Sequence, residues 1–88
     1  MMIEYKVGQV VRHFKADFNC PEEERQMKYY YVITALPWDA TEQRFAVVYQ
    51  ALYGDHMLFV RSLGEFSSLV DVEKYPEVKQ KHRFEVIT

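Results

Sequence analysis

The chain has 88 residues, which corresponds to one small domain, and its formal net charge is -2 at pH 7. Hydrophobic residues make up 49% and charged residues 27%, a balance that indicates a globular protein and excludes an intrinsically disordered one. The slightly negative charge argues against a protein that coats nucleic acid through a bulk positive potential, although it leaves room for a local basic site.

The cysteine content and the absence of long apolar runs bear on the cellular location. Cys20 is the one cysteine, so no intramolecular disulfide can form, and we expect a reducing compartment. The segment MMIEYKVG lacks the basic region and apolar run of a signal peptide. No apolar run approaches the roughly 20 residues needed to cross a membrane. We therefore expect a cytoplasmic protein with one domain over residues 1–88 and no membrane partner.

The first half of the chain contains two predicted strands. Gly8 precedes the first, at residues 9–14, and residues 28–36 form the second, which is dense in tyrosine, valine and isoleucine. The link between them, Ala16–Met27, is polar and acidic. Its pattern leaves open whether it is a loop or holds a short helix, because Pro21 and the glutamates after it would suit a helix N-terminus.

The second half contains three more predicted strands. Residues 37–39 interrupt the chain before a strand at residues 44–52 and another at residues 56–62. Residues 63–70 predict a short helical or 3₁₀ turn, and a charged loop leads to a last strand at residues 83–88. Five to six short strands separated by turn signals predict a mainly β fold, a small antiparallel β-barrel or roll with at most one short helical turn.

The register of the hairpin at residues 48–61 decides which of its side chains face the core. If Gly54-Asp55 is a two-residue turn, which the positive φ of a glycine permits, Tyr49 lies opposite Val60, and paired residues share a face. One face is then apolar and should belong to the core: Val47, Tyr49, Ala51, Leu58 and Val60. The other face is mixed and should be partly wet: Val48, Gln50, Leu52, Met57, Phe59 and Arg61.

Two pairs of residues are candidates for ligand binding. Phe59 and Arg61 are neighbours on the mixed face, and a phenyl ring beside a guanidinium can hold a planar or anionic ligand. The alternative is that a loop covers Phe59 and that Arg61 is solvated or ion-paired. Arg12 and His13 form the second pair, because a phosphate or carboxylate ligand would need a bidentate donor such as the guanidinium of Arg12. Their alternative role is structural, as partners of loops or of nearby carboxylates.

The segment VYQALYGD, Val48–Asp55, and the segment at residues 59–63 resemble the signature of a bacterial family catalogued as domain of unknown function 1653. VRHFK, Val11–Lys15, and the pair Arg83-Phe84 resemble its opening and closing patterns and stand in the same order. Ser62 occupies a position where the family pattern has proline. The resemblance implies a small SH3-like β-barrel or roll and brings no known activity.

Sequence motifs for catalysis or for metal binding are weak. The link Ala16–Met27 replaces a short glycine-containing turn of the family, and Cys20 within it matches nothing in the pattern. No motif joins Cys20 to a histidine, so we do not expect it to be a nucleophile. The three histidines form no metal-binding motif, and the three glycines stand alone rather than in a phosphate loop. We expect neither a metal nor a cofactor.

These observations favour a non-catalytic binding module that contacts a peptide, a nucleic acid or a small anionic ligand. SH3-like barrels expose a shallow surface of aromatic and polar groups, and this analogy of fold supports the interpretation. The predicted surface consists of five residues: Arg12, His13, Tyr53, Phe59 and Arg61. The identity of a protein or nucleic-acid partner stays open.

Two alternatives belong to other classes of function. A structural or homo-oligomeric protein would use an apolar strand edge, and the run Tyr29-Tyr30-Tyr31 could supply the interface. A nucleotide-related enzyme would use His13 as a general base and Arg12 as an anion clamp. This enzyme hypothesis requires His13 and Arg12 to converge in one concave pocket.

Overall fold

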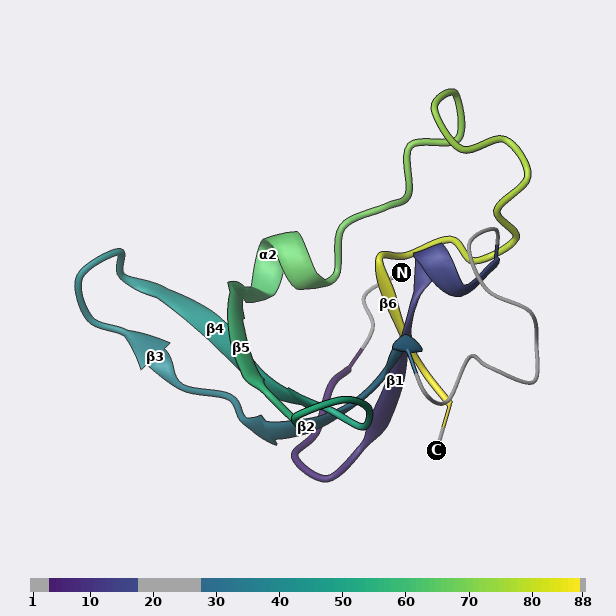
Figure 1. Cartoon of the computed structure of the whole chain (residues 1–88). Coiled ribbons are helices and arrows are strands. Elements are labelled where there is room, and N and C mark those ends of the chain that lie inside the picture. The colour runs from purple at the N-terminus through teal and green to yellow at the C-terminus, as the bar shows by residue number, and fades with distance from the viewer. Residues whose placement is uncertain (1–3, 18–27, 88) are drawn as a thin grey trace.

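The computed structural model describes residues 4–17 and 28–87. Six strands form one antiparallel sheet in which the hydrogen-bonded order is β3-β4-β2-β1-β6, and β5 also pairs with β4 (Figure 1). Their bounds are Val10–His13 for β1, Tyr30–Ala35 for β2, Trp38–Asp39 for β3, Arg44–Ala51 for β4, Leu58–Ser62 for β5 and Phe84–Val86 for β6. The mainly β, antiparallel character predicted from the sequence is confirmed.

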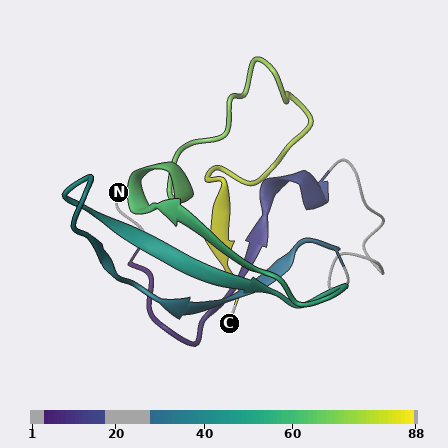
Figure 2. The same cartoon turned by 60° about the vertical axis from the view of Figure 1, so that its left-hand side comes forward.

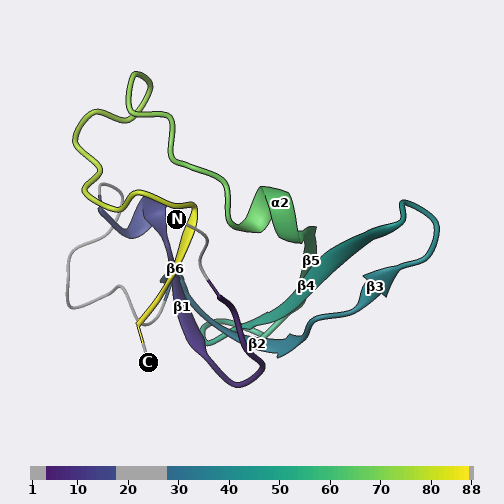
Figure 3. The same cartoon turned by 180° about the vertical axis from the view of Figure 1, so that it is seen from behind.

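The sheet is bent but open. A bulge between Ile33 and Ala35 shifts the pairing of β2 with β4, and bulges of this kind increase the bend of a strand. The predicted fold was a β-barrel or roll; among the described residues, β5 and β6 do not pair with each other, so the barrel is not confirmed. An isolated bridge between Leu69 and His82 lies in the chain that connects α2 with β6. Figures 2 and 3 show this connection arching over the side of the sheet where α2 lies.

Two short helical turns occur in the described residues, so the prediction of at most one was wrong. The 3₁₀ turn η1, Phe14–Asp17, follows β1 directly, and α2, Leu63–Phe66, follows β5. The Nδ1 atom of His13 accepts a hydrogen bond from the backbone N–H of Lys15 at 3.1 Å. A side chain that bonds the backbone two residues ahead competes with the strand ladder, which explains why β1 ends at His13.

For most of the other elements, the observed ends lie within about two residues of the predicted ends. Different methods of assigning helices and strands disagree by a similar number of residues. The exceptions are β3, which the sequence analysis treated as an interruption, and α2, which was predicted over residues 63–70 and ends at Phe66. Of the link Ala16–Met27, residues 18–27 lie outside the described residues, Cys20 among them. None of the helices in the part of the chain that the structure describes is long and apolar enough to cross a membrane.

Aromatic rings dominate the core. Phe66 of α2 and Phe84 of β6 are stacked with their ring centroids 4.1 Å apart, and Tyr49 packs against Phe84 at 5.1 Å. The hydroxyl of Tyr5 donates to the carbonyl of Phe84 at 2.7 Å. Tyr31 is also buried, so the proposed interface through the tyrosine run of residues 29–31 loses its last residue to the core. The buried cluster comprises Tyr5, Val11, Tyr31, Ile33, Val47, Tyr49, Ala51, Phe66 and Phe84.

The register of the β4–β5 hairpin differs from the predicted register by one residue. Tyr49 lies opposite Phe59, and Val48 lies opposite Val60. The backbone N–H of Ala51 donates to the carbonyl of Met57 at 3.0 Å, so residues 52–56 form the connection rather than a two-residue turn. Both Gly54 and His56 have positive φ, at 58° and 55°. A glycine in a sequence indicates that a positive φ is possible, whereas a histidine such as His56 does not, so the sequence did not predict this longer turn.

This difference reverses the two faces of β5, because a slip of one residue moves every side chain to the other face. Phe59 and Arg61 lie on the concave side with Tyr49, whereas Leu58 and Val60 are 61% and 66% exposed. The assignment of Leu58 and Val60 to the core was therefore wrong. The assignment of Val47, Tyr49 and Ala51 was right, since all three are buried.

Candidate functional site

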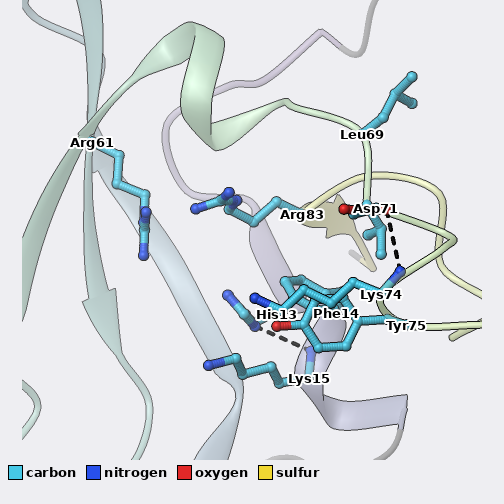
Figure 4. Close-up of a pocket in the computed structure, with 10 residues that line it drawn as sticks. His13, Phe14, Lys15, Arg61, Leu69, Asp71, Lys74, Tyr75 and Arg83 are labelled. Atoms are coloured by element: carbon cyan, nitrogen blue, oxygen red, sulfur yellow. Dashed lines mark hydrogen bonds between the residues drawn. The ribbon is translucent and has the colours of Figure 1, made fainter.

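A cleft lies between the concave side of the sheet and the connection from α2 to β6. It consists of two adjoining hollows that share His13, Lys15 and Arg61. The cationic hollow, of about 330 Å³, is completed by residues that include Asp71, Lys74, Tyr75 and Arg83 (Figure 4). The aromatic hollow, of about 230 Å³, is completed by Tyr29, Tyr31, Tyr49, Tyr53, Phe59 and Phe84. Together the hollows reach the size of ordinary ligand sites, about 300–1,000 Å³.

Arg61 reaches the cleft because of the observed register of β5. Its Nε donates to the hydroxyl of Tyr49 at 2.9 Å, and its Nη1 forms an ion pair with the carboxylate of Glu65 in α2. Burial acts to lower the pKa of Arg61, but the hydrogen bonds to Tyr49 and Glu65 raise it on balance. The guanidinium is thus a permanent charge held in one orientation by a core tyrosine.

Arg83 approaches the same space from the residue before β6. Its Nη1 lies 3.7 Å from Oε1 of Glu65, so the two arginines share one carboxylate. In Figure 4 the guanidinium groups of Arg61 and Arg83 are turned toward each other. The Nε atom of Arg83 is buried and has no hydrogen-bond partner among the described residues. A buried donor without an acceptor costs about 1–3 kcal/mol.

His13 is a neutral donor at the floor of the cleft. The imidazole is buried, stacks on Phe14 at 4.7 Å between centroids and meets the edge of Phe84 at 4.8 Å. Because Nδ1 accepts the hydrogen bond from Lys15, the ring proton belongs on Nε2. Burial, together with the charges of Lys15, Arg61 and Arg83, lowers the pKa of His13 to about 3. At neutral pH the group is therefore an uncharged N–H donor and a weak base.

Two lysines add positive charge at the rim. Lys15 is exposed, and Figure 4 shows its side chain extending from η1 on the side of the cleft where His13 lies. The Nζ of Lys74 lies 5.4 Å from the centroid of the Tyr75 ring, within the range of a cation–π contact. The backbone N–H of Lys74 donates to the Asp71 carboxylate at 3.2 Å, which fixes the loop at this point.

The aromatic hollow combines rings with hydroxyl groups. The hydroxyls of Tyr31 and Tyr53 are hydrogen-bonded at 2.7 Å, and the rings of Tyr49 and Phe59 are stacked at 5.5 Å. Burial and the hydrogen bond to Tyr53 raise the pKa of Tyr31, so this hydroxyl stays protonated. Tyr31 and Tyr49 are buried, whereas Tyr29, Tyr53 and Phe59 are half-buried and present ring surface to the hollow.

The structure brings four of the five predicted site residues together. His13, Tyr53, Phe59 and Arg61 all line the aromatic hollow. Arg12 does not line either hollow, since neighbouring residues of a strand point to opposite faces. Its Nε donates to Oε1 of Gln80 at 2.9 Å instead. In the two hollows of the described residues, Arg12 and His13 therefore do not converge as the enzyme hypothesis required.

Several residues of the cleft were missed by the sequence analysis. Lys15 and Arg83 stand inside the family-like patterns, so a search of those patterns for every cation would have found them. Lys74 and Tyr75 belong to a loop without periodicity, and their position depends on contacts such as that of Tyr75 with Phe14, at 5.0 Å between ring centroids. The described residues contain no group of three or more histidine, cysteine, aspartate and glutamate side chains that could hold a metal ion.

Comparison with known proteins gives one match. Residues 9–86 match the model of a family described as "Protein of unknown function (DUF1653)". The match includes every residue that lines the two hollows. No curated protein and no solved structure matches the chain.

Proposed function

Since the chain belongs to the DUF1653 family, whose description states no activity, we propose from the cleft itself that this protein is a non-catalytic binding module. Its ligand is a small anion, or the anionic part of a larger molecule. The ligand lies in the cationic hollow, where it meets Arg61 and Arg83.

The observation that carries the proposal is the convergence of donors on one space. Lys15, Arg61 and Arg83 each lower the pKa of His13, which places three positive charges within electrostatic range of one neutral N–H donor. Among the described residues at the cleft, the carboxylates are those of Glu65 and Asp71. Arginine binds carboxylate and phosphate in a bidentate geometry, and hydrogen bonds to charged groups contribute about 1.5–3 kcal/mol each.

The same geometry favours binding over proton transfer. A general base needs a pKa near the working pH, and that of His13 is lowered to about 3. The hydroxyl of Tyr31 has a raised pKa and stays protonated. The polar groups that face the cleft are therefore suited to hold a ligand rather than to take a proton from it.

Titration with inorganic phosphate and pyrophosphate, followed by calorimetry and by thermal unfolding, tests the proposal. A ligand at 100 times its Kd stabilises the folded protein by about 2.7 kcal/mol, which a melting curve detects. Arg61→Gln and Arg83→Gln are expected to weaken phosphate binding about tenfold or more. The matched control is Arg44→Gln, which removes the same charge from an exposed position outside the cleft. Equal affinities in all three variants would contradict the assignment of the site.

We also infer that the open sheet is an SH3-like roll. Support comes from the strand order, in which the last strand, β6, returns to lie beside the first, β1. Further support comes from the backbone bonds of Val70 to Lys81, at 2.7 Å, and of Arg83 to Ser68, at 2.8 Å, which extend the connection beside β6. Nuclear Overhauser contacts between residues 68–70 and 81–83 would test this arrangement in solution.

The cytoplasmic location stays part of the proposal. With Cys20 as its one cysteine, the chain forms no intramolecular disulfide and gains nothing from an oxidising compartment. Fractionation of cells that express the protein from its own promoter would test the location.

A second function, self-association, is favoured by the outer surface of β5. Leu58 and Val60 are exposed on a strand that pairs on one side only among the described strands. Exposed apolar edge strands favour pairing with another chain. Sedimentation of the wild type and of Val60→Lys would test it: a wild-type monomer at high concentration, or an oligomer unchanged by Val60→Lys, would exclude this interface.

A further inference from the structure

The two hollows differ in chemistry but share three residues, and this juxtaposition narrows the class of ligand. On one side, Arg61, Arg83 and Lys15 surround a space suited to an anion. On the other side, the half-buried rings of Tyr29, Tyr53 and Phe59 line a space suited to a planar group. His13, Lys15 and Arg61 belong to both hollows, so a single ligand can extend from one into the other.

From this we infer that the cleft takes a nucleotide unit, with the base in the aromatic hollow and the phosphate among Arg61, Arg83 and Lys15. The inference rests on the proposed function and adds the class of its ligand. Base stacking on aromatic side chains and phosphate binding by arginine are the two interactions by which proteins hold single nucleotides in a strand.

The hydroxyl groups of the aromatic hollow favour a heteroaromatic base over a plain phenyl ring. Tyr31 and Tyr53 share one hydrogen bond of 2.7 Å, in which one hydroxyl donates and the other accepts. The accepting hydroxyl keeps its own proton, so the pair offers one further O–H donor as well as free lone pairs. A nucleobase edge carries matching carbonyl, ring-nitrogen and amino groups, whereas the ring of a phosphotyrosine has none.

The charge of the whole chain favours one nucleotide unit over a long tract. The formal net charge is -2, and the cations of the cleft are concentrated in the cationic hollow. A protein that contacts Z phosphates of a single strand shows a slope of about -0.7Z in log affinity against log salt concentration. We expect a slope that corresponds to one or two phosphates.

Affinities of the full-length protein for four groups of probes test the inference: inorganic phosphate, the four nucleoside monophosphates, a phosphotyrosine peptide, and single-stranded oligonucleotides. We expect at least one nucleoside monophosphate to bind about tenfold or more tightly than inorganic phosphate, since stacking of one base contributes a factor of this order. If an oligonucleotide binds more tightly than the corresponding mononucleotide, the ligand is a nucleotide unit within a nucleic-acid strand. If the two affinities are equal, the ligand is a free nucleotide.

Variants separate the two halves of the ligand. Tyr53→Ala is expected to weaken nucleotide binding roughly fivefold to a hundredfold and to leave phosphate binding unchanged, because it removes a stacking surface. Tyr53→Phe, which keeps the ring and so protects the fold, should lose only the contribution of the hydroxyl. Arg83→Gln should weaken the binding of phosphate and nucleotide together.

The outcomes distinguish the inference from the function on which it rests. If phosphate binds at Arg61 and Arg83 but no nucleotide binds more tightly than phosphate, the inference fails and the anion-binding function stands. If the phosphotyrosine peptide binds more tightly than every nucleotide, the inference also fails. If none of the probes binds, the proposed function fails as well.

Discussion

Lowering the pH from 7 to 5 is expected to reduce the free energy of unfolding by about 2 kcal/mol through His13 alone. In the unfolded chain the imidazole has its ordinary pKa of 6.5, whereas burial lowers the pKa of the folded state to about 3. Between these two values the unfolded chain binds a proton that the folded chain does not bind. Stability therefore falls as the pH drops through 6.5 and stops falling below the folded pKa.

The magnitude follows from the two pKa values. At pH 5 an unfolded histidine is protonated about thirty times more often than it is neutral, which stabilises the unfolded state by about 2 kcal/mol. At pH 7 the same effect is only about 0.2 kcal/mol. The folded state gains almost nothing at either pH, since His13 is buried, accepts the backbone hydrogen bond of Lys15, and lies near three cations.

Urea unfolding at pH 5, 6 and 7, followed by circular dichroism, measures this difference, because domains of this size usually unfold in a two-state transition. His13→Asn is the test variant, since its side-chain oxygen can accept the hydrogen bond of Lys15 without titrating. We expect its stability to change by about 2 kcal/mol less between pH 7 and pH 5 than that of the wild type. Identical pH dependence in the wild type and His13→Asn would refute the argument.

Three further experiments have defined outcomes. Glu65→Gln frees Arg61 and Arg83 from their shared carboxylate, so the affinity for phosphate should rise several-fold in calorimetry. The free energy of unfolding should change by less than about 1 kcal/mol, as it does when an exposed ion pair is removed. Weaker phosphate binding would show that Glu65 positions the arginines instead. Phe66→Ala removes a fully buried ring and should cost about 3–5 kcal/mol in urea unfolding. Val60→Thr should change the free energy of unfolding by less than about 0.5 kcal/mol, because position 60 is exposed. Val47→Thr should reduce it by about 1–3 kcal/mol, because the new hydroxyl is buried at position 47. Equal effects of the two substitutions would contradict the observed register.

The sequence was a good guide to the strands and a poor one to the register of β5. Alternating β-branched and aromatic residues predict β2 and β4 because those patterns depend on burial of one face. The register depends on the connection of residues 52–56, in which His56 takes a positive φ that its residue type does not predict. The error at this connection moved Leu58 and Val60 to the wrong face.

The candidate site was predicted in part: His13, Tyr53, Phe59 and Arg61 were found, whereas Lys74 and Tyr75 of the loop between α2 and β6 were missed. Phe59 and Arg61 were paired correctly with each other, since residues two apart share a face in either register. Tyr75 could not be found from sequence, because its place in the cleft results from packing against Phe14 across the molecule. Arg12 was chosen with His13 although the alternation of a strand separates them.

The floor of the cleft and the hydrophobic core share the same aromatic residues. Tyr49 packs in the core and orients Arg61 by its hydroxyl, and Phe84 stacks on Phe66 while it supports His13. Substitutions that reshape the floor therefore also destabilise the fold, and they are selected against for that reason, whatever their effect on ligand binding. Lys74 does not have this conflict, because it is exposed in the loop that forms the opposite wall. Adaptation to new ligands within this family should thus proceed through the loop while the floor stays fixed.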